Sequence, residues 1–291
     1  MQVNRVYVRP MGGLGNQLFQ YAVAYGVARK HSAQLIIDTR FFDNYELHGG
    51  FRLYNLNISV SEMTNADLKK FPEWKCKLLS KFPQVTRFFN EYIYDKVGDL
   101  NEIKSNDAML LGYWQNETNF HQYKNELVTI FKPKIISEND NKKAESILAT
   151  NSVVIHIRRG DYINNPIAYK HHGVCSLNYY KQAINEMKKN TKNIFFYIFS
   201  DDIEWCRENI TPLFSEYDSF SFVRGETQEV DMWLMSCGKY HIIANSSFSW
   251  WGAFLSTNPD QIVIAPTPWF DITQKYTGDP SLPQWIKIDK Y

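Results

Sequence analysis

The sequence predicts an α/β protein with two domains, each built on a mainly parallel sheet. Three observations lead to this class. The chain has 291 residues, of which 44% are hydrophobic, so it can fill two cores of ordinary size. Its first 38 residues show a strand, a turn, a helix and a second strand. From residue 151 onward, short apolar runs alternate with helical segments, as in parallel sheets covered by helices.

The N-terminal segment predicts a β-α-β unit. Residues 5–9 form a strand and residues 11–15 a glycine-rich turn. Asn16 is a suitable N-cap for a helix that extends to Lys30. The apolar residues 35–37 form the second strand, which ends at Asp38. Two strands joined by one helix normally pair in parallel.

The middle of the chain, residues 41–120, gives the weakest pattern. It contains a sheet-like run at 51–58, helical stretches rich in Lys and Phe, and a strand at 109–113. Helices are expected at 120–131 and at 138–149. We place the domain boundary after the second of them, so that the N-terminal domain covers residues 1–150 and the C-terminal domain residues 151–291.

The C-terminal domain shows clear alternation, which predicts a doubly wound, Rossmann-like sheet. Strands are expected at 152–157, 194–200, 220–223, 240–244 and 261–265, and helices at 177–189, 203–209, 228–236 and 248–255. Ligands of such sheets bind outside the carboxyl ends of the strands, so the residues that follow each strand are the candidates for function.

The composition excludes several classes of protein. A net charge of +1 provides no basic surplus for a nucleic-acid partner. The four cysteines include no C-x-x-C pair and are interpreted as reduced thiols. No signal-peptide pattern and no apolar run of membrane-spanning length is present, so we expect a cytoplasmic location.

The turn after the first strand contains Gly13 and Gly15, followed by Asn16. Small residues before a helix let backbone N–H groups approach a diphosphate, although a plain tight turn would have the same composition. With Asp38 further on, the G-x-G pattern imitates the dinucleotide fingerprint. That interpretation is disfavoured because Leu18 occupies the position of the third glycine.

The strand at 152–157 leads into the segment HIRRGDY. Strand alternation places His156 and Arg158 on the same side. The planar fork of arginine matches phosphate oxygens, whereas an Arg–Asp pair could also brace the loop. We expect both uses, with one of Arg158 and Arg159 binding phosphate and the other acting as a brace.

Two further strand ends carry polar groups. In FSDD, a carboxylate of Asp201 or Asp202 matches the paired N–H donors of guanine, although one of the two could instead cap the next helix. In ANSSFSWWGAF, small hydroxyl and amide residues and the start of a helix offer donors to a phosphate, although Ser247 or Ser249 could equally be a plain N-cap. Trp250 and Trp251 are interpreted as packing residues.

No metal site is expected from the sequence. There is no H-E-x-x-H motif and no D-x-D at a strand end that would hold a metal–nucleotide complex. Arginine, hydroxyl groups and helix N-termini are therefore left to stabilise a departing diphosphate, and we expect that no cofactor or metal is required.

The strings GGLGNQLFQYA, HIRRGDY, FSDD and ANSSFSWWGAF, in this order, resemble the motifs of the α-1,2-fucosyltransferase family of bacterial surface-glycan and blood-group H type enzymes. The resemblance extends from Gly12 to Phe254. It implies a GT-B architecture, in which two facing Rossmann-like domains enclose a cleft. The C-terminal domain would bind GDP-fucose and the N-terminal domain would mainly hold the acceptor.

The resemblance also assigns site residues. It implies that Arg158 binds the β-phosphate, that His156 lies by the nucleotide and that Asp202 reads guanine. Ser246 and Ser247 would contact the diphosphate. Asn16, with the glycine turn, would face the donor from the other domain.

The reaction implied by the resemblance is a single displacement with inversion, in which an acceptor hydroxyl attacks β-linked fucose and GDP departs. Asp161 is the first candidate for the base. Glu46, His48, His171 and His172 are held in reserve. A loose transition state could also proceed without a strong base.

The expected partners are GDP-fucose and a galactose-terminated oligosaccharide or lipid-linked glycan, with no nucleic acid. A lipid-linked acceptor would bring the protein to the inner membrane as a peripheral protein. Two alternatives stay open. One is a sugar-nucleotide-binding or lectin-like protein without turnover, and the other is a transferase of another linkage or sugar, including a protein O-fucosyltransferase.

Overall fold

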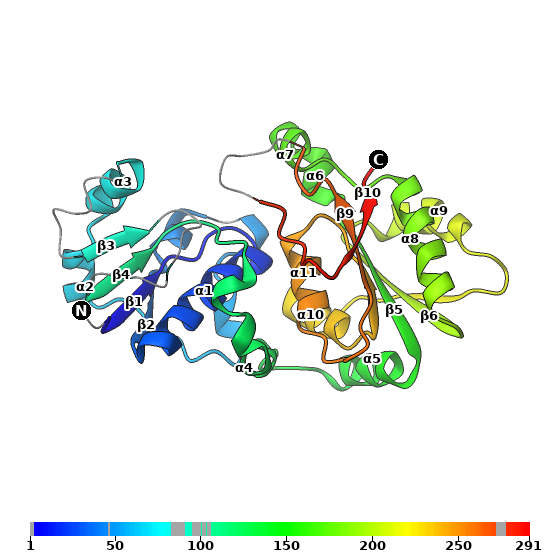
Figure 1. Ribbon diagram of the computed structural model, residues 1–291, viewed down its shortest axis with the longest axis horizontal. Coiled ribbons are helices and arrows are strands. Elements are labelled where there is room, and N and C mark those ends of the chain that lie inside the picture. The colour runs from blue at the N-terminus through cyan, green and yellow to red at the C-terminus, as the bar shows by residue number, and fades with distance from the viewer. Residues whose placement is uncertain are drawn as a thin grey trace. The chain divides into compact units, whose positions relative to one another are not determined.

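The computed structural model describes residues 3–45, 47–82, 91–94, 100, 103, 106–271 and 278–291. The chain forms two compact units, Met1–Phe131 and Lys132–Tyr291 (Figure 1). Each unit contains one sheet with helices packed against it, and each is described here by itself.

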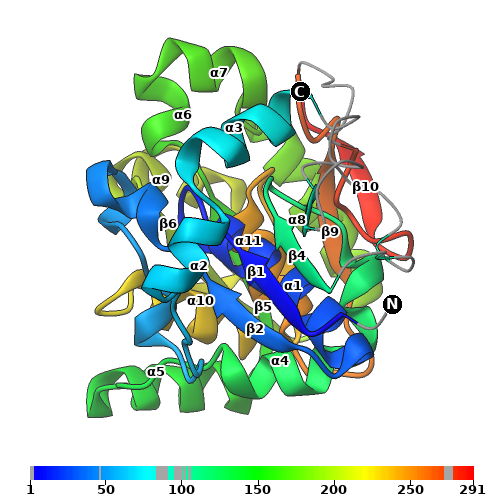
Figure 2. The same cartoon turned by 90° about the vertical axis from the view of Figure 1, so that its left-hand side faces the viewer.

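The first unit has a four-stranded parallel sheet in the order β2-β1-β4-β3. Its strands are β1 (Arg5–Val8), β2 (Gln34–Ile37), β3 (Glu91–Tyr94) and β4 (Asp107–Leu110). Its helices are α1 (Leu14–His31), α2 (Asn65–Lys70), α3 (Glu73–Lys81) and α4 (Lys124–Ile130). Figure 2 shows α1 beside the sheet, and most of its side chains are buried. Short 3-10 helices occupy Arg40–Asn44, Leu47–Gly49, Leu53–Asn55, Glu117–Asn119 and His121–Tyr123.

Several expectations for this unit were wrong in detail. Helix α1 begins at Leu14 with Gly13 as its N-cap, so Asn16 lies in the first turn and is not the cap. The run at 51–58 contains no extended strand, because the Arg52 N–H donates to the side chain of Gln17 and the chain turns there. Strand β4 ends at Leu110 because Gly112 and Trp114 adopt positive φ, which extended backbone does not allow.

Gly26 allows close packing between α1 and the 3-10 helix at Glu117–Asn119. A Cβ added at Gly26 would lie 1.9 Å from the backbone oxygen of Asn119. We therefore expect Gly26→Ala to lower the free energy of unfolding by at least about 2 kcal/mol, through overpacking. Urea unfolding measures this change. Gly278→Ala is the control, because no described atom lies within 4 Å of a Cβ at that position. Equal stability of the two variants would contradict the packing described.

The second unit has a six-stranded parallel sheet in the order β10-β9-β8-β5-β6-β7. Its strands are β5 (Asn151–Ile157), β6 (Ile194–Ser200), β7 (Ser219–Phe222), β8 (Tyr240–Ile242), β9 (Val263–Thr267) and β10 (Ile286–Asp289). Numbered along this unit, the order is 6-5-4-1-2-3, which is the Rossmann arrangement. The expected doubly wound sheet is confirmed, and its topological switch point lies between β5 and β8.

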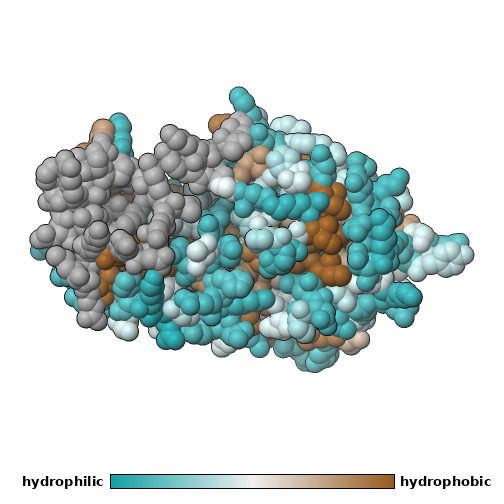
Figure 3. Space-filling model, in the orientation of Figure 1, coloured by the Kyte–Doolittle hydropathy of each residue, from teal (hydrophilic) through white to brown (hydrophobic). Residues whose placement is uncertain are grey.

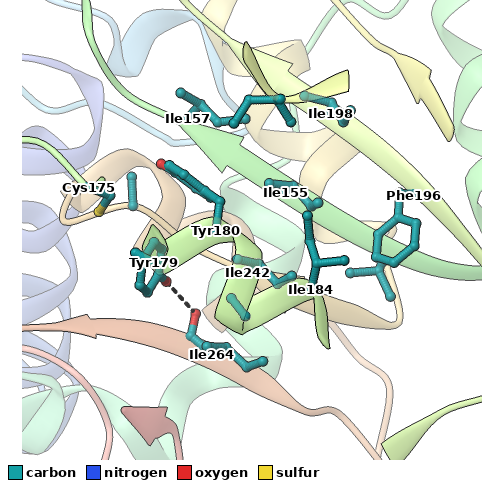
Figure 4. Packing of buried hydrophobic residues seen from close by; sticks show 14 of the residues in the cluster. Ile155, Ile157, Cys175, Tyr179, Tyr180, Ile184, Phe196, Ile198, Ile242 and Ile264 are labelled. Carbon is teal, nitrogen blue, oxygen red and sulfur yellow. Dashed lines mark hydrogen bonds between the residues drawn. The ribbon is translucent and has the colours of Figure 1, made fainter. Parts of the chain in front are cut away.

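Helices cover this sheet and close its core. They are α5 (Glu138–Ala149), α6 (Gly160–Asn164), α7 (Pro166–His172), α8 (Leu177–Asn190), α9 (Ile203–Asn209), α10 (Gln228–Ser236) and α11 (Ser247–Phe254), with a 3-10 helix at Thr211–Leu213. In the core, Tyr179 and Ile184 of α8 pack toward Ile155 of β5 and Ile264 of β9 (Figure 4). The buried Tyr179 hydroxyl donates to the carbonyl oxygens of Ile243 and Ile264, at 2.6 and 3.3 Å, so its polar group is satisfied.

The expected domain boundary near residue 150 is wrong, because α5 belongs to the second unit. The Lys143 ammonium donates to the carbonyl oxygen of Arg224 at 2.7 Å, and the Tyr197 hydroxyl donates to the carbonyl oxygen of Ser146 at 2.9 Å. The unit boundary therefore precedes α5, between Phe131 and Lys132.

The described residues present a mostly polar surface on the face that Figure 3 draws. Hydrophilic residues dominate the part of the face that Figure 3 colours. Among the described residues, no helix combines the length and apolar character needed to cross a bilayer.

Candidate functional site

The HIRRGDY and ANSS segments meet at the switch point of the second sheet. They follow β5 and β8, which are hydrogen-bonded neighbours. The Tyr162 hydroxyl donates to the carbonyl oxygen of Asn245 at 3.2 Å, and the rings of His156 and Phe248 lie 5.6 Å apart. Because ligands of doubly wound sheets bind at this point, the two motifs form the candidate site.

Two arginine–aspartate pairs join the loop after β5 to the loop after β6. Arg158 Nη1 lies 3.0 Å from Asp201 Oδ2, and Arg159 Nε donates to Asp202 Oδ2 at 3.2 Å. The Arg159 guanidinium also lies 3.6 Å from the centre of the Trp205 ring. Both arginines thus have carboxylate partners, and Arg159 is the more firmly braced because it also stacks on an indole.

Gly160 lets these loops approach each other. A Cβ at this position would lie 2.6 Å from Asp201 Oδ2, the oxygen that pairs with Arg158. The Arg159 N–H donates to Asp201 Oδ1 at 2.9 Å. The R-R-G spacing therefore fixes the Asp201 carboxylate, and through it the guanidinium of Arg158.

Asp202 has a capping role in the structure. Its Oδ1 accepts from the Trp205 N–H at 3.2 Å at the start of α9, while Oδ2 accepts from Arg159. The capping interpretation is thus confirmed. The side chain is still 37% exposed, so lone pairs stay accessible to a ligand.

His156 is a buried imidazole, and within the described residues its Nδ1 has no hydrogen-bond partner. Burial lowers the pKa of His156 to about 4. The nearby Asp201 carboxylate raises this pKa, and the positive charge of Arg158 lowers it further. The ring is therefore neutral near pH 7, with one nitrogen able to donate and the other to accept.

This depressed pKa makes stability depend on pH. The unfolded chain binds a proton on His156 below its ordinary pKa of 6.5, whereas the folded chain does so only near 4. Folding is therefore penalised as pH falls from about 6.5 to 4, by on the order of 3 kcal/mol in total. We expect His156→Asn to remove this part of the pH dependence, which urea unfolding at pH 4.5 and 7.5 measures. If the free energy of unfolding changed equally with pH in the variant and in the natural sequence, this role of His156 would be refuted.

The three polar residues after β8 have different structural roles. Asn245 is buried, and its Nδ2 donates to the carbonyl oxygens of His172 and Trp269, at 2.7 and 3.2 Å. Ser246 is the N-cap of α11, where its Oγ accepts from the Phe248 N–H at 3.3 Å. Ser247, the first helical residue, is partly exposed. The expected cap, Ser247 or Ser249, was wrong, because the cap is Ser246 and both later serines lie within the helix. Helix α11 presents its N-terminus at the sheet edge that carries Arg158.

Two fully buried indoles extend inward from this helix. Trp250 and Trp251 are both 0% exposed, and the Trp250 Nε1–H donates to the carbonyl oxygen of Pro280 at 2.8 Å. Their interpretation as packing residues is confirmed.

The segment between β5 and α8 adds an aromatic cluster beside Arg158. The rings of Tyr162 and His172 stack at 4.5 Å, His171 and Phe270 adjoin them, and the Arg158 guanidinium lies 5.7 Å from the centre of the Tyr162 ring. The sequence analysis assigned no helix here. Pro166 at the first position of α7, after an Asn165 cap, is the signal that was missed.

The structure describes the side chains of some candidates for the base and not of others. Asp161 falls within α6, but its side chain lies outside the described residues, as does the whole of Glu46. His171 and His172 belong to the cluster beside Arg158. His48 lies in the first unit, with its ring 3.5 Å from the position of a Cβ on Gly13.

The glycine turn lies at the corresponding edge of the first sheet, where β1 and β4 are neighbours. Gly12 has φ of +74°, which favours glycine, and the Gln17 amide donates to its carbonyl oxygen at 2.9 Å. Asn16 Oδ1 accepts from Gln115 Nε2 at 2.9 Å. Gln115, after β4, has a place in this cluster that no motif indicated. Gly13 caps α1 and Gly15 is buried within it.

The dinucleotide-binding interpretation is not supported at this turn. Asp38, the acid that would bind ribose, is 1% exposed and accepts from Arg9 at 2.8 Å and from Arg40 at 2.7 and 2.8 Å. Both of its carboxylate oxygens therefore accept hydrogen bonds from guanidinium groups.

In the ranges that the structure describes, no group of three or more His, Cys, Asp and Glu side chains is placed to hold a metal ion.

Comparison with known proteins assigns the chain to a family. The family model described as "Glycosyl transferase family 11" matches residues 5–289. The chain belongs to this family. It is 44% identical to an alpha-1,2-colitosyltransferase of Escherichia coli, over 98% of this chain and 99% of that protein. It is 31% identical to the O-antigen biosynthesis glycosyltransferase WbnK of Escherichia coli, over 95% and 98%. The galactoside alpha-(1,2)-fucosyltransferase 2 of Oryctolagus cuniculus is 22% identical, over 97% and 76%. The resemblance to α-1,2-fucosyltransferases is therefore confirmed at the level of the family.

Solved structures of fucosyltransferases share the fold of this family 11 chain. Arabidopsis thaliana FUT1 in complex with GDP matches with a TM-score of 0.56 and 12% identity, over 90% of this chain and 70% of that one. NodZ from Bradyrhizobium matches with a TM-score of 0.52 and 14% identity, over 88% and 94%. These similarities support α/β parallel sheets consistent with GT-B.

Proposed function

We propose that this family 11 glycosyltransferase transfers a 6-deoxy-L-sugar from a GDP donor to the 2-hydroxyl of a terminal galactoside, with inversion and without a metal ion. L-Fucose is the first candidate for the sugar. The observation that carries the proposal is the placement of Arg158 and the N-terminus of α11 at one switch point, in a chain of this family.

The diphosphate is assigned to this switch point because it can be neutralised there without a metal. Arg158 is 24% exposed and pairs with Asp201, and the planar fork of its guanidinium matches phosphate oxygens at this partly exposed position. Backbone N–H groups at the start of α11 and the hydroxyl of Ser247 add donors, and the helix dipole favours an anion there. Leaving-group stabilisation of this kind lowers the barrier of a displacement with an oxocarbenium-like transition state.

The guanine is assigned to Asp202. Its carboxylate would accept the paired donors of the base through lone pairs that Arg159 and Trp205 leave accessible. His156 is neutral and buried, and its Nδ1 has no hydrogen-bond partner in the described part of the chain, so we propose that it bonds the nucleotide or sugar directly.

The acceptor hydroxyl attacks the anomeric carbon as the bond to the β-phosphate oxygen breaks, and its proton passes to a base or to solvent. Asp161 remains the first candidate for this base, and the described His171 and His172 are the reserves. Gly13, Gly15 and Asn16 of the glycine turn remain proposed donor-binding residues.

Colitose is the second candidate for the sugar, favoured by the 44% identity to an alpha-1,2-colitosyltransferase. Colitose is L-fucose without its 3-hydroxyl. A site built to hydrogen-bond that hydroxyl rejects the deoxy sugar by roughly 10⁴-fold, because buried polar groups are left unpaired, whereas an apolar surface discriminates by only about 10²-fold. The ratio of kcat/KM for the two donors therefore reports which sugar the site was built for.

The test is transfer from GDP-fucose and from GDP-colitose, separately and in competition, to lactose, N-acetyllactosamine and Gal-β-1,3-GalNAc, with NMR of the product linkage. An α-1,2 product is expected. A different linkage would refute the acceptor position, and nucleotide-sugar binding without turnover on any acceptor would favour a binding protein. Surface-glycan synthesis on the cytoplasmic side of the membrane is the role that this reaction would serve.

A further inference from the structure

Helix α3 of the first unit presents an exposed apolar and basic face. Trp74 is 64% exposed, Leu78 39% and Phe82 42%, and they recur at every fourth position. Lys77 and Lys81 lie on the same face. At 3.6 residues per turn, the five side chains fall within an arc of about 140°.

The opposite side of α3 is anchored in the core. Cys76 is 1% exposed and packs in a cluster with Tyr7 and Phe71. Lys75 is also buried, and its ammonium donates to the carbonyl oxygen of Lys70 at 3.2 Å. The orientation of α3 is therefore fixed by packing, and the exposure of Trp74 follows from that orientation.

The charge of this face is positive. The one acid on the helix, Glu73, lies 2.9 Å from Arg9 Nη2, 3.8 Å from Arg40 Nη1 and 3.9 Å from Lys77 Nζ, so one negative charge is shared among three cations. The Lys77 side chain is 76% exposed, and the Lys81 ammonium lies 5.6 Å from the centre of the Phe82 ring. Cations therefore flank the apolar stripe.

We propose that this α3 face is a docking surface for an anionic lipid bilayer. Trp, Leu and Phe on one side of a helix with lysines beside them are the groups that insert at the headgroup–acyl boundary, while lysine attracts anionic headgroups. Charge complementarity favours a membrane as the occupant. Scattered exposed residues such as Ile135 and Tyr217 show no comparable spacing. The inference does not depend on the identity of the transferred sugar.

The test is co-sedimentation of the full chain with vesicles of phosphatidylcholine, with and without 30% phosphatidylglycerol. Binding is expected on the anionic vesicles. Lys77→Ala with Lys81→Ala should weaken it roughly 30-fold, since each basic residue near such a surface contributes about fivefold. Trp74→Ser with Leu78→Ser should weaken it at least about tenfold through the loss of apolar insertion.

Matched controls remove residues of the same kind elsewhere. Ile135→Ser with Leu148→Ser replaces side chains that are 86% and 59% exposed, and Lys181→Ala with Lys192→Ala removes two exposed lysines. Both control pairs should bind within twofold of the natural sequence. All variants should keep their unfolding midpoint and their transfer rate on a soluble acceptor, which separates this inference from the proposed reaction. Absence of anionic-vesicle binding by the natural sequence, or equal losses in the controls, would overturn it.

Discussion

Replacing Arg158 by alanine should lower kcat/KM by about 10³-fold or more, because the variant loses a charged donor aimed at the departing diphosphate. Its stability should change by less than about 1 kcal/mol. The Arg158–Asp201 pair is partly exposed, and Asp201 keeps the hydrogen bond from the Arg159 N–H. The measurements are initial rates across donor concentrations and a urea unfolding curve.

Two variants sharpen the test of Arg158. Arg158→Lys keeps the charge but loses the planar fork, so it should recover only part of the activity. Arg207→Ala removes an exposed arginine that pairs with Glu204 on α9, and it should transfer at the natural rate. Near-normal turnover by Arg158→Ala would contradict the placement of the diphosphate.

Replacing Asn245 by aspartate should destabilise the fold by on the order of 3–5 kcal/mol at pH 7.5. The Asn245 amide donates to the carbonyl oxygens of His172 and Trp269 in a buried position, and the weak thiol donor of Cys175 reaches only its Oδ1. In the aspartate variant, the oxygen that replaces Nδ2 would therefore face two acceptors. Burial and these oxygens would raise the pKa of the new carboxyl group in the folded state. The variant should therefore regain stability as pH falls and lose it as pH rises through the folded pKa.

Asn245→Ala is the control, because it removes the same two hydrogen bonds without adding a charge. It should cost about 1–3 kcal/mol with no added dependence on pH. Urea unfolding of both variants at pH 5 and pH 7.5 makes the comparison. If the free energy of unfolding changed equally with pH in the aspartate and alanine variants, the buried environment described for Asn245 would be contradicted.

The fold of the second unit was predictable because its strands are apolar runs separated by capped helices. The bounds of β6, α9 and α10 agree with the sequence analysis to the residue. In the first unit, polar side chains such as Gln17 bond to loop backbone and override local strand preference, which no periodicity reveals. The start of α1 was misplaced because Gly13 caps it through backbone conformation alone.

The candidate site was predictable as a set of strand ends but not as a set of contacts. Sequence order places Arg158 and Asp202 after neighbouring strands, and their meeting follows from the parallel sheet. Which arginine pairs with which carboxylate depends on loop geometry, including the close approach at Gly160. The hydrogen bonds of Asn245 likewise join segments far apart in sequence, so they could be found only in the structure.

The most direct test of the central claim is GDP release from GDP-fucose and GDP-colitose in the presence of EDTA, with and without a galactoside. The account predicts release that requires the acceptor, survives EDTA and is lost in Arg158→Ala. Failure of both donors to bind, or release that depends on a divalent metal, would contradict it.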